Sequence, residues 1–170
     1  YLNGKADWIN DSTRKSYMKK ISMLSKNVIG AKASDFLVKN DKEQPVALKN
    51  IFPTHAYTLL IFWSPSCNHC MDEIPRLDSA IVSMNKDVVI VGVDAYGEGP
   101  EWKKYITEHA FKANWIHLHD PEKKASYKSD YSVYTTPVIY LIDRKGVIVG
   151  KRLTHENLKE TLDDLASKHK

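Results

Sequence analysis

The chain has 170 residues, of which 42% are hydrophobic and 27% charged, and its formal net charge is +4. These values are typical of one globular domain with room for a short appendage, which folds without disulfide staples. Basic residues are interspersed with acidic ones, which argues against a nucleic-acid surface. No apolar run approaches the ~18 residues that indicate a membrane span. The two cysteines therefore need a chemical explanation rather than a structural one.

Residues 1–28 are predicted to contain an N-terminal helix, separate from a domain over 29–170. Four apolar residues recur at helical spacing, namely Tyr17, Ile21, Leu24 and Val28. Residues 10–12 are suitable N-caps, and Gly30 is a suitable stop. We expect this helix to be either the tail of an upstream domain or a cap on the fold that follows.

The rest of the chain alternates between strand and helix patterns. The expected strands are 36–38 and 44–48, which form a hairpin, then 57–63, 87–94, 115–119, 137–142 and 147–149. The expected helices are 68–84, 101–111 and 157–166, with a helical turn near 123–129. This order predicts an α/β/α sandwich of three layers around a central mixed sheet, extended by the N-terminal helix and hairpin.

Two histidines on one predicted strand could begin a metal site. His117 and His119 alternate along the strand and therefore share a face. We expect this face to be the exposed side of an edge strand.

Cys67 and Cys70 are the only cysteines, and they follow a buried strand at the start of a helix. Their spacing lets the two sulfurs form or break a disulfide with little backbone movement. The N–H groups and partial positive charge of a helix N-terminus stabilise a thiolate at Cys67, which is the attacking species in thiol–disulfide exchange. Cys70 begins a buried helical stripe that continues through Ile74, Leu77, Ile81 and Met84. We therefore expect Cys67 to be the nucleophile and Cys70 the resolving thiol.

Two other uses of the cysteine pair remain open. A static disulfide would stabilise little, because the loop that it closes is so short. A zinc site generally requires four ligands, and the chain has no second cysteine pair. Neither a metal nor an organic cofactor is expected, and the Cys67–Cys70 couple itself would carry the electrons.

The segment Phe62–Cys70, with Glu73 and Pro75 after it, resembles the TlpA/ResA-like branch of the thioredoxin superfamily. The similarity runs from about Val28 to Lys170 and includes Thr136-Pro137. The resemblance implies a thiol–disulfide oxidoreductase that acts outside the cytoplasm, either in the periplasm or anchored to a membrane. It also implies that Pro137 is cis beside the cysteines and that the Thr136 backbone pairs with an extended substrate.

The resemblance assigns roles to further residues near the motif. Glu73 matches a glutamate that helps to set thiol acidity and proton transfer, although an exposed carboxylate that complements the helix dipole is the alternative. Pro75 matches a proline that kinks the helix. Trp63 is expected in the packed wall of the substrate site and, with His69, Thr136 and Pro137, among the substrate-binding residues. Ser66 replaces the tryptophan that most relatives carry, which should open the surface around Cys67.

His69 bears on the direction of the reaction. Reducing members of the superfamily commonly have proline here, whereas a histidine resembles the motifs of protein disulfide isomerase and DsbA. A cationic or N–H group beside the thiolate favours the reduced form and makes the disulfide more oxidising. A solvent-facing histidine without influence is the alternative.

The sequence thus predicts a protein thiol–disulfide oxidoreductase that acts as a disulfide reductase. There are two alternatives. The protein could act as a disulfide oxidase or isomerase, or it could be a binding module whose disulfide takes no part in chemistry. A peroxidase of the peroxiredoxin type would need Pro at position 60 and Thr at position 64, where the chain has Leu60 and Ser64. The expected partners are client proteins with cysteine pairs and an upstream thiol donor, with no nucleic acid, and we expect a monomer with a membrane tether outside this sequence.

Overall fold

The computed structural model describes residues 10–168, with the side chains of residues 22–24 left out. A seven-stranded sheet forms its centre, in the order β2-β1-β5-β4-β3-β6-β7. The strands are β1 (Leu37–Asn40), β2 (Pro45–Ala47), β3 (Tyr57–Trp63), β4 (Val88–Asp94), β5 (Trp115–His119), β6 (Val138–Asp143) and β7 (Ile148–Lys151). The sheet is mixed, because β3, β4 and β5 run parallel while β1, β2, β6 and β7 form antiparallel pairs.

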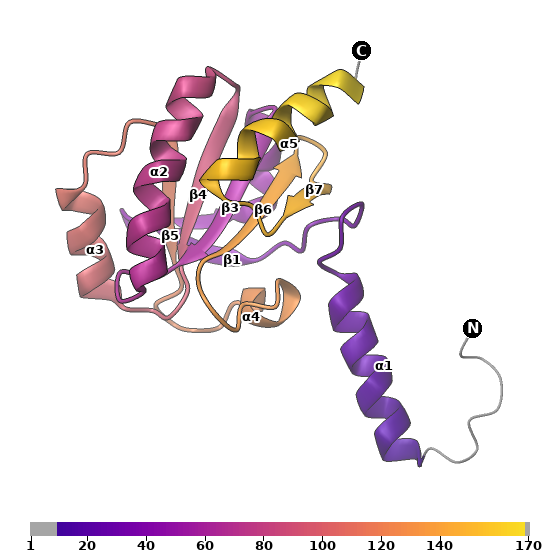
Figure 1. Cartoon of the computed structure of the whole chain (residues 1–170). Helices are drawn as coiled ribbons and strands as arrows, with labels where there is room; N and C mark the ends of the chain where they lie inside the picture. The colour runs from indigo at the N-terminus through magenta and orange to yellow at the C-terminus, as the bar shows by residue number, and fades with distance from the viewer. Residues whose placement is uncertain (1–9, 169–170) are drawn as a thin grey trace.

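Helices cover both faces of this sheet (Figure 1). The helices are α1 (Asp11–Ser25), α2 (Asn68–Met84), α3 (Gly99–Glu108), α4 (Tyr127–Asp130) and α5 (His155–Lys168), with two 3-10 helices, η1 (Leu48–Asn50) and η2 (Phe52–Thr54). The core residues of α2, α3 and α5 pack together on one face, and those of η1, η2 and α4 pack on the other. No helix in the described part of the chain is long and apolar enough to cross a membrane.

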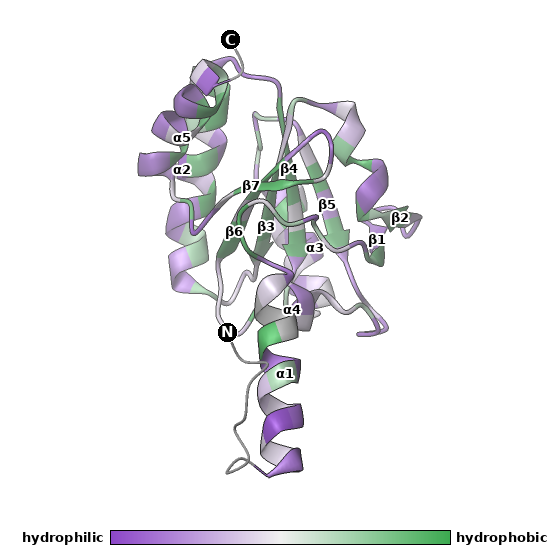
Figure 2. Cartoon of the chain, turned by 90° about the vertical axis from the view of Figure 1, so that its right-hand side faces the viewer, coloured by the Kyte–Doolittle hydropathy of each residue, from purple (hydrophilic) through white to green (hydrophobic). Residues whose placement is uncertain are grey.

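The central strands are buried because both faces are covered. All residues of β4, and all residues of β3 after Tyr57, are buried, as their continuous apolar runs predict. Figure 2 shows hydrophobic residues gathered on these strands and hydrophilic residues on the outer surfaces of α2 and α5. The predicted three-layer sandwich with a mixed sheet is therefore confirmed.

The N-terminal helix extends away from this body. Its start matches the prediction, since the Asn10 side chain accepts a hydrogen bond from the Thr13 N–H (2.8 Å), but the helix ends at Ser25, before Gly30. Of the predicted apolar stripe, Tyr17 and Ile21 are exposed, so α1 does not cap the sheet (Figure 1). Leu24 lies outside the described side chains, and the domain boundary at residue 28 remains a prediction.

The structure corrects the placement of the predicted hairpin and of the two histidines. The hairpin β1–β2 is part of the central sheet, because β1 pairs with β5 and thereby makes β5 an interior strand. His119 is 6% exposed and stacks on Trp102, with ring centroids 5.0 Å apart. His117 stacks on Trp115 at 5.4 Å, and burial lowers its pKa to about 4. The expectation of an exposed edge-strand face was wrong.

Candidate active site

The first cysteine lies where β3 passes into α2. Cys67 is the N-cap of the helix, and its Sγ accepts a hydrogen bond from the Cys70 N–H at 3.2 Å. Hydrogen bonds fix the loop before Cys67. The buried Ser64 hydroxyl donates to the Glu98 carboxylate and lies 2.8 Å from the Ser66 hydroxyl. Cys67 is thus partly exposed at the open end of a helix whose first N–H groups point at its sulfur.

Across from this helix end lies a loop with a cis peptide bond between Thr136 and Pro137. The Cys67 Sγ is 3.3 Å from the Thr136 carbonyl oxygen, to which the thiol donates. Residues 69 positions apart in sequence are therefore in direct contact, as the resemblance implied. The backbone of Thr136 is therefore next to the sulfur of Cys67.

The two thiols differ strongly in acidity. Partial burial opposes ionisation of Cys67, but hydrogen bonds from the side chains of Cys70 and Thr136 and from the backbone N–H groups of Cys70 and His69 outweigh it, so its pKa falls below the ordinary value. Burial, followed by the hydrogen bond to Cys67, raises the pKa of Cys70 to about 12. Both cysteines are free in this structure, and Cys70 is fully buried. The arrangement suits attack by Cys67 and a later, proton-dependent attack by Cys70.

Cys70 also starts the packed face of α2, as the helical spacing predicted. Ile74 and Leu77 are fully buried, and Ile81 is 4% exposed. Pro75 lies inside the helix, which continues to Met84. Whether this proline kinks the helix remains a prediction.

Glu73 is tied to the N-terminus of α5. One carboxylate oxygen accepts the His155 backbone N–H at 2.5 Å, and the other is 2.8 Å from His155 Nδ1. The Glu73 side chain is only 16% exposed. The alternative of a freely exposed first-turn carboxylate is therefore wrong, and His155 is a partner that the sequence reasoning missed.

Two other predicted residues lie beside the cysteines in different ways. The His69 side chain is exposed and lines a surface groove, and its backbone N–H acts on Cys67. Trp63 is fully buried, with its ring 5.2 Å from the ring of Tyr105. A client could not touch this indole without displacing its neighbours. The expectation that Trp63 is a substrate-binding residue was therefore wrong, and Trp63 belongs to the packed support of the site.

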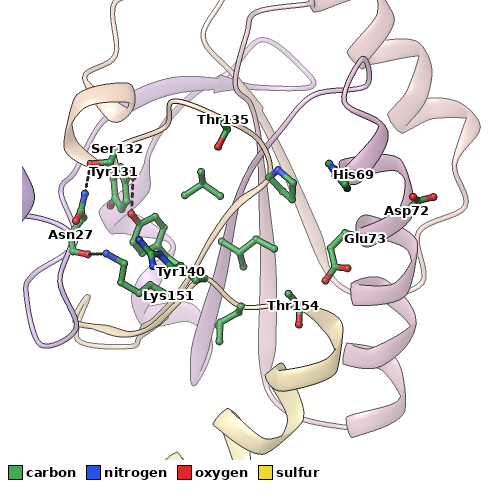
Figure 3. A pocket seen from close by; sticks show the side chains of 15 residues that line it. Asn27, His69, Asp72, Glu73, Tyr131, Ser132, Thr135, Tyr140, Lys151 and Thr154 are labelled. Atoms are coloured by element: carbon green, nitrogen blue, oxygen red, sulfur yellow. Dashed lines mark hydrogen bonds between the residues drawn. The ribbon is translucent and has the colours of Figure 1, made fainter.

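A groove of about 600 Å³ opens next to Pro137, and we call it the active-site groove. Its lining includes His69, Asp72, Glu73, Pro137, Tyr140, Lys151 and Arg152. In Figure 3, His69 and Glu73 on α2 face Tyr140 and Lys151 across the open space. The groove therefore joins the helix that carries the cysteines to the end of β7.

The basic side of this groove was not foreseen. Lys151 and Arg152 follow the last predicted strand, where the sequence shows only a polar stretch after Gly150. Lys151 Nζ donates to the Asn27 carbonyl at 3.0 Å, and the buried Asn27 amide donates to the Ser132 hydroxyl. The available signal was the pair Lys151 and Arg152, which comes at the end of the last strand, close to the proline loop.

Comparisons with known proteins identify the family of the chain. Residues 29–151 match the model of the AhpC/TSA family. The chain is 26% identical over 134 residues to the sporulation thiol-disulfide oxidoreductase A of Bacillus subtilis, covering 76% of this chain and 78% of the relative. It is 27% identical over 143 residues to the thiol:disulfide interchange protein DsbE of Haemophilus influenzae, covering 72% and 76%.

A solved structure extends the comparison to the fold. The thioredoxin domain of a thiol-disulfide oxidoreductase from Bacteroides vulgatus superimposes with a TM-score of 0.68 at 27% identity. The match covers 81% of this chain and 97% of that domain. The family match spans well over half of the sequence, and the similar proteins are thiol–disulfide oxidoreductases with a thioredoxin-like fold. The chain therefore belongs to the AhpC/TSA family, in its thioredoxin-like, thiol–disulfide oxidoreductase part.

Proposed function

We propose that the protein reduces disulfides of client proteins through the Cys67–Cys70 pair. The Cys67 thiolate attacks a client sulfur, the client disulfide breaks, and the released client thiolate takes up a proton. Cys70 then loses its proton and attacks Cys67 Sγ, which frees the second client thiol and leaves a Cys67–Cys70 disulfide. An upstream dithiol returns the two electrons. The observation that carries this proposal is the contrast between an acidic, accessible Cys67 and a buried Cys70 in one helical turn.

The same geometry supports a role for the Thr136-Pro137 loop in holding the client. The Thr136 carbonyl lies 3.3 Å from Cys67 Sγ, so a client cysteine bonded to Cys67 would lie against this backbone. Backbone pairing beside the sulfur would fix the client in an extended form without demanding a particular sequence. His69, on the other side of the groove, would contact residues that flank the client cysteine.

Glu73 is the proposed acid–base group for Cys70. It lines the groove with His69 and Pro137, and its carboxylate is held in place by His155. A fixed carboxylate beside a water-accessible groove could accept the proton that Cys70 must lose, because a thiol with a pKa of about 12 is not ionised at neutral pH. His155 is then a positioning residue for Glu73.

The compartment and the partners are proposed from the similarity to known oxidoreductases. We propose an extracytoplasmic location, with client proteins that contain cysteine pairs and a thiol donor upstream. A thiol–disulfide oxidoreductase from Bacillus subtilis and an interchange protein from Haemophilus influenzae are among the relatives, which supports protein thiols as substrates. A monomer without metal or organic cofactor is part of the same proposal.

The test is the reduction potential of the Cys67–Cys70 couple, measured by equilibration with glutathione or dithiothreitol. Characterised thiol–disulfide proteins span about −270 to −120 mV, a difference of ~7 kcal/mol for two electrons. A potential near the lower end supports a reductase. A potential near the upper end contradicts it and favours the second candidate, an oxidase or isomerase, for which the His69 backbone N–H on Cys67 is the specific observation.

Two variants separate the contributions of His69. His69→Gln removes the imidazole but keeps the backbone N–H, whereas His69→Pro removes the N–H as well. Loss of a hydrogen bond to a thiolate, worth about 1.5–3 kcal/mol, should lower the potential of His69→Pro by about 30–60 mV. His55→Gln, at the opposite end of β3, is the matched control. A Cys70→Ser protein that traps no mixed disulfide with any client would instead favour the idle binding module.

A further inference from the structure

The basic side of the active-site groove carries a positive charge, that of Arg152, which no acidic side chain of residues 10–168 pairs with. Arg152 is exposed, and among residues 10–168 no carboxylate forms an ion pair or hydrogen bond with its guanidinium. Its neighbour Lys151 is occupied, since Nζ donates to Asn27 and lies 5.9 Å from the ring of Tyr140. Arg152 is therefore the cation of this groove that is available to a ligand.

The backbone places Arg152 close to the site of exchange. Its N–H donates to the Ile139 carbonyl at 3.0 Å, and Ile139 is two residues beyond Pro137 on β6. Two residues along a strand and one step across a sheet amount to about 8 Å between Arg152 and Pro137. Arg152 has a φ of 57°, which is rare for a residue with a side chain. The side chain is thus held at the groove by an uncommon backbone conformation.

Tyr140, which lines the groove, is close enough to Arg152 for the charge to affect its pKa. Burial raises the pKa of Tyr140 to about 12, and the positive charge of Arg152 acts against that rise. Tyr140 is 3% exposed, and its hydroxyl donates to the Tyr131 carbonyl at 2.7 Å. Tyr140 is accordingly uncharged at neutral pH, so it does not neutralise the charge of Arg152.

The opposite side of the groove carries the opposite sign. Asp72 on α2 is exposed there, and the Glu73 carboxylate is already bound by His155. An acidic ligand group would be repelled near α2 and attracted near the end of β7. The separation of charge across the groove therefore favours one orientation of an elongated ligand.

We propose that the groove binds an extended client segment that carries an aspartate or glutamate two or three residues from the reacting cysteine, with this carboxylate on Arg152. The proposal rests on the proposed function, because the cysteine of the segment must meet Cys67. An extended chain advances about 3.3 Å per residue, so two or three residues beyond a client cysteine that lies against Pro137 span the distance of about 8 Å from Pro137 to Arg152. The planar guanidinium can accept a carboxylate in two parallel hydrogen bonds, which a lysine cannot do.

The experiment compares disulfide-linked homodimers of short, serine-rich peptides with one central cysteine. Aspartate, asparagine or lysine is placed two or three residues before or after the cysteine. The second-order rate constant for reduction by the reduced protein is divided by that for reduction by dithiothreitol, which removes the effect of the charge on the peptide's own thiol chemistry. At one or more of these positions, aspartate should be roughly three- to tenfold faster than asparagine, and lysine slower.

Variants assign the preference to its residue. Arg152→Gln should abolish the aspartate preference, measured as the ratio of the rate for the aspartate peptide to the rate for the asparagine peptide, and Arg152→Lys should keep part of that ratio. Arg144→Gln is the matched control, because Arg144 is an exposed arginine beyond the other end of β6 and should leave the preference intact. Added salt should reduce the preference in the wild-type protein.

The failures are distinguishable. If aspartate and asparagine peptides react alike, if Arg152→Gln keeps the preference, or if lysine is preferred, the assignment of the groove is wrong while disulfide reduction stands. If the protein reduces no peptide faster than a Cys67→Ser variant does, the proposed function itself is wrong, and this inference falls with it.

Discussion

The difference in acidity between the two thiols leads to a quantitative prediction for single-cysteine variants. Burial raises the pKa of Cys70 to about 12 from an ordinary value of 9.0. At pH 8 a thiol with a pKa of 12 is ionised to about 1 part in 10,000, against about 1 part in 10 for an ordinary thiol. Iodoacetamide reacts with the thiolate, and burial, the largest cause of the raised pKa, persists in the Cys67→Ser variant. Cys70 in that variant should therefore react more slowly than an ordinary cysteine, by up to about a thousandfold.

Cys67 in the Cys70→Ser variant should behave in the opposite way. Its Sγ keeps the backbone N–H of residue 70 as a donor, and the serine hydroxyl can donate in place of the Cys70 thiol, so the pKa of Cys67 should stay below the ordinary value. Alkylation of each variant, followed by mass spectrometry across a range of pH, measures both midpoints. The same variants unfolded in urea are the control, because their thiols should then react equally. Equal rates in the folded proteins, or faster reaction of Cys70, would refute the assignment of nucleophile and resolving thiol.

Three further predictions concern stability, each measured by urea unfolding. Asp78→Asn should lower the free energy of unfolding by about 2–4 kcal/mol, because the buried carboxylate accepts three N–H donors from residues 112–115 and an amide cannot; a loss below 0.5 kcal/mol would contradict this estimate. Gly146→Ala should cost about 1–3 kcal/mol, since φ is +73° and an added Cβ would lie 3.0 Å from the ring of Phe52; unchanged stability would show that the turn relaxes. Burial holds the pKa of His117 at about 4, below its ordinary 6.5, so the unfolded chain binds the extra proton between these values. Stability should therefore fall by about 3 kcal/mol as the pH is lowered from 6.5 to 4, and His117→Gln should remove most of this dependence.

The elements closest to the cysteines could be predicted because their signals are local. The apolar run of β3, the helical stripe that begins at Cys70 and the Thr136-Pro137 pair each occupy a short stretch of sequence. Their burial and spacing in the structure agree with these patterns. Local periodicity, combined with a resemblance to a family, was sufficient for the fold and for the centre of the site.

The parts that were missed depend on contacts between distant segments. The exposed histidine face was expected because nothing in residues 115–119 reveals that β1 will pair beside them. Asp78 lies on the buried side of α2 and is satisfied only by N–H groups more than 30 residues away. The pairing of Glu73 with His155 likewise joins residues 82 positions apart. Such partners are set by the packing of α2 against α5 and the sheet, which no pattern within one helix contains.

The outer edges of the sheet influence how the protein meets extended chains in solution. At one edge β2 has three residues and begins with Pro45, which has no N–H to offer. At the other edge, residues 30–33 already hydrogen-bond with residues 146–148, at the start of β7. A loose strand from a partly unfolded client therefore gains few backbone hydrogen bonds by joining either border of the sheet. In the proposed function, weak pairing at the sheet edges limits unproductive binding of clients and favours the Thr136 backbone beside Cys67 as the place where an extended client strand binds.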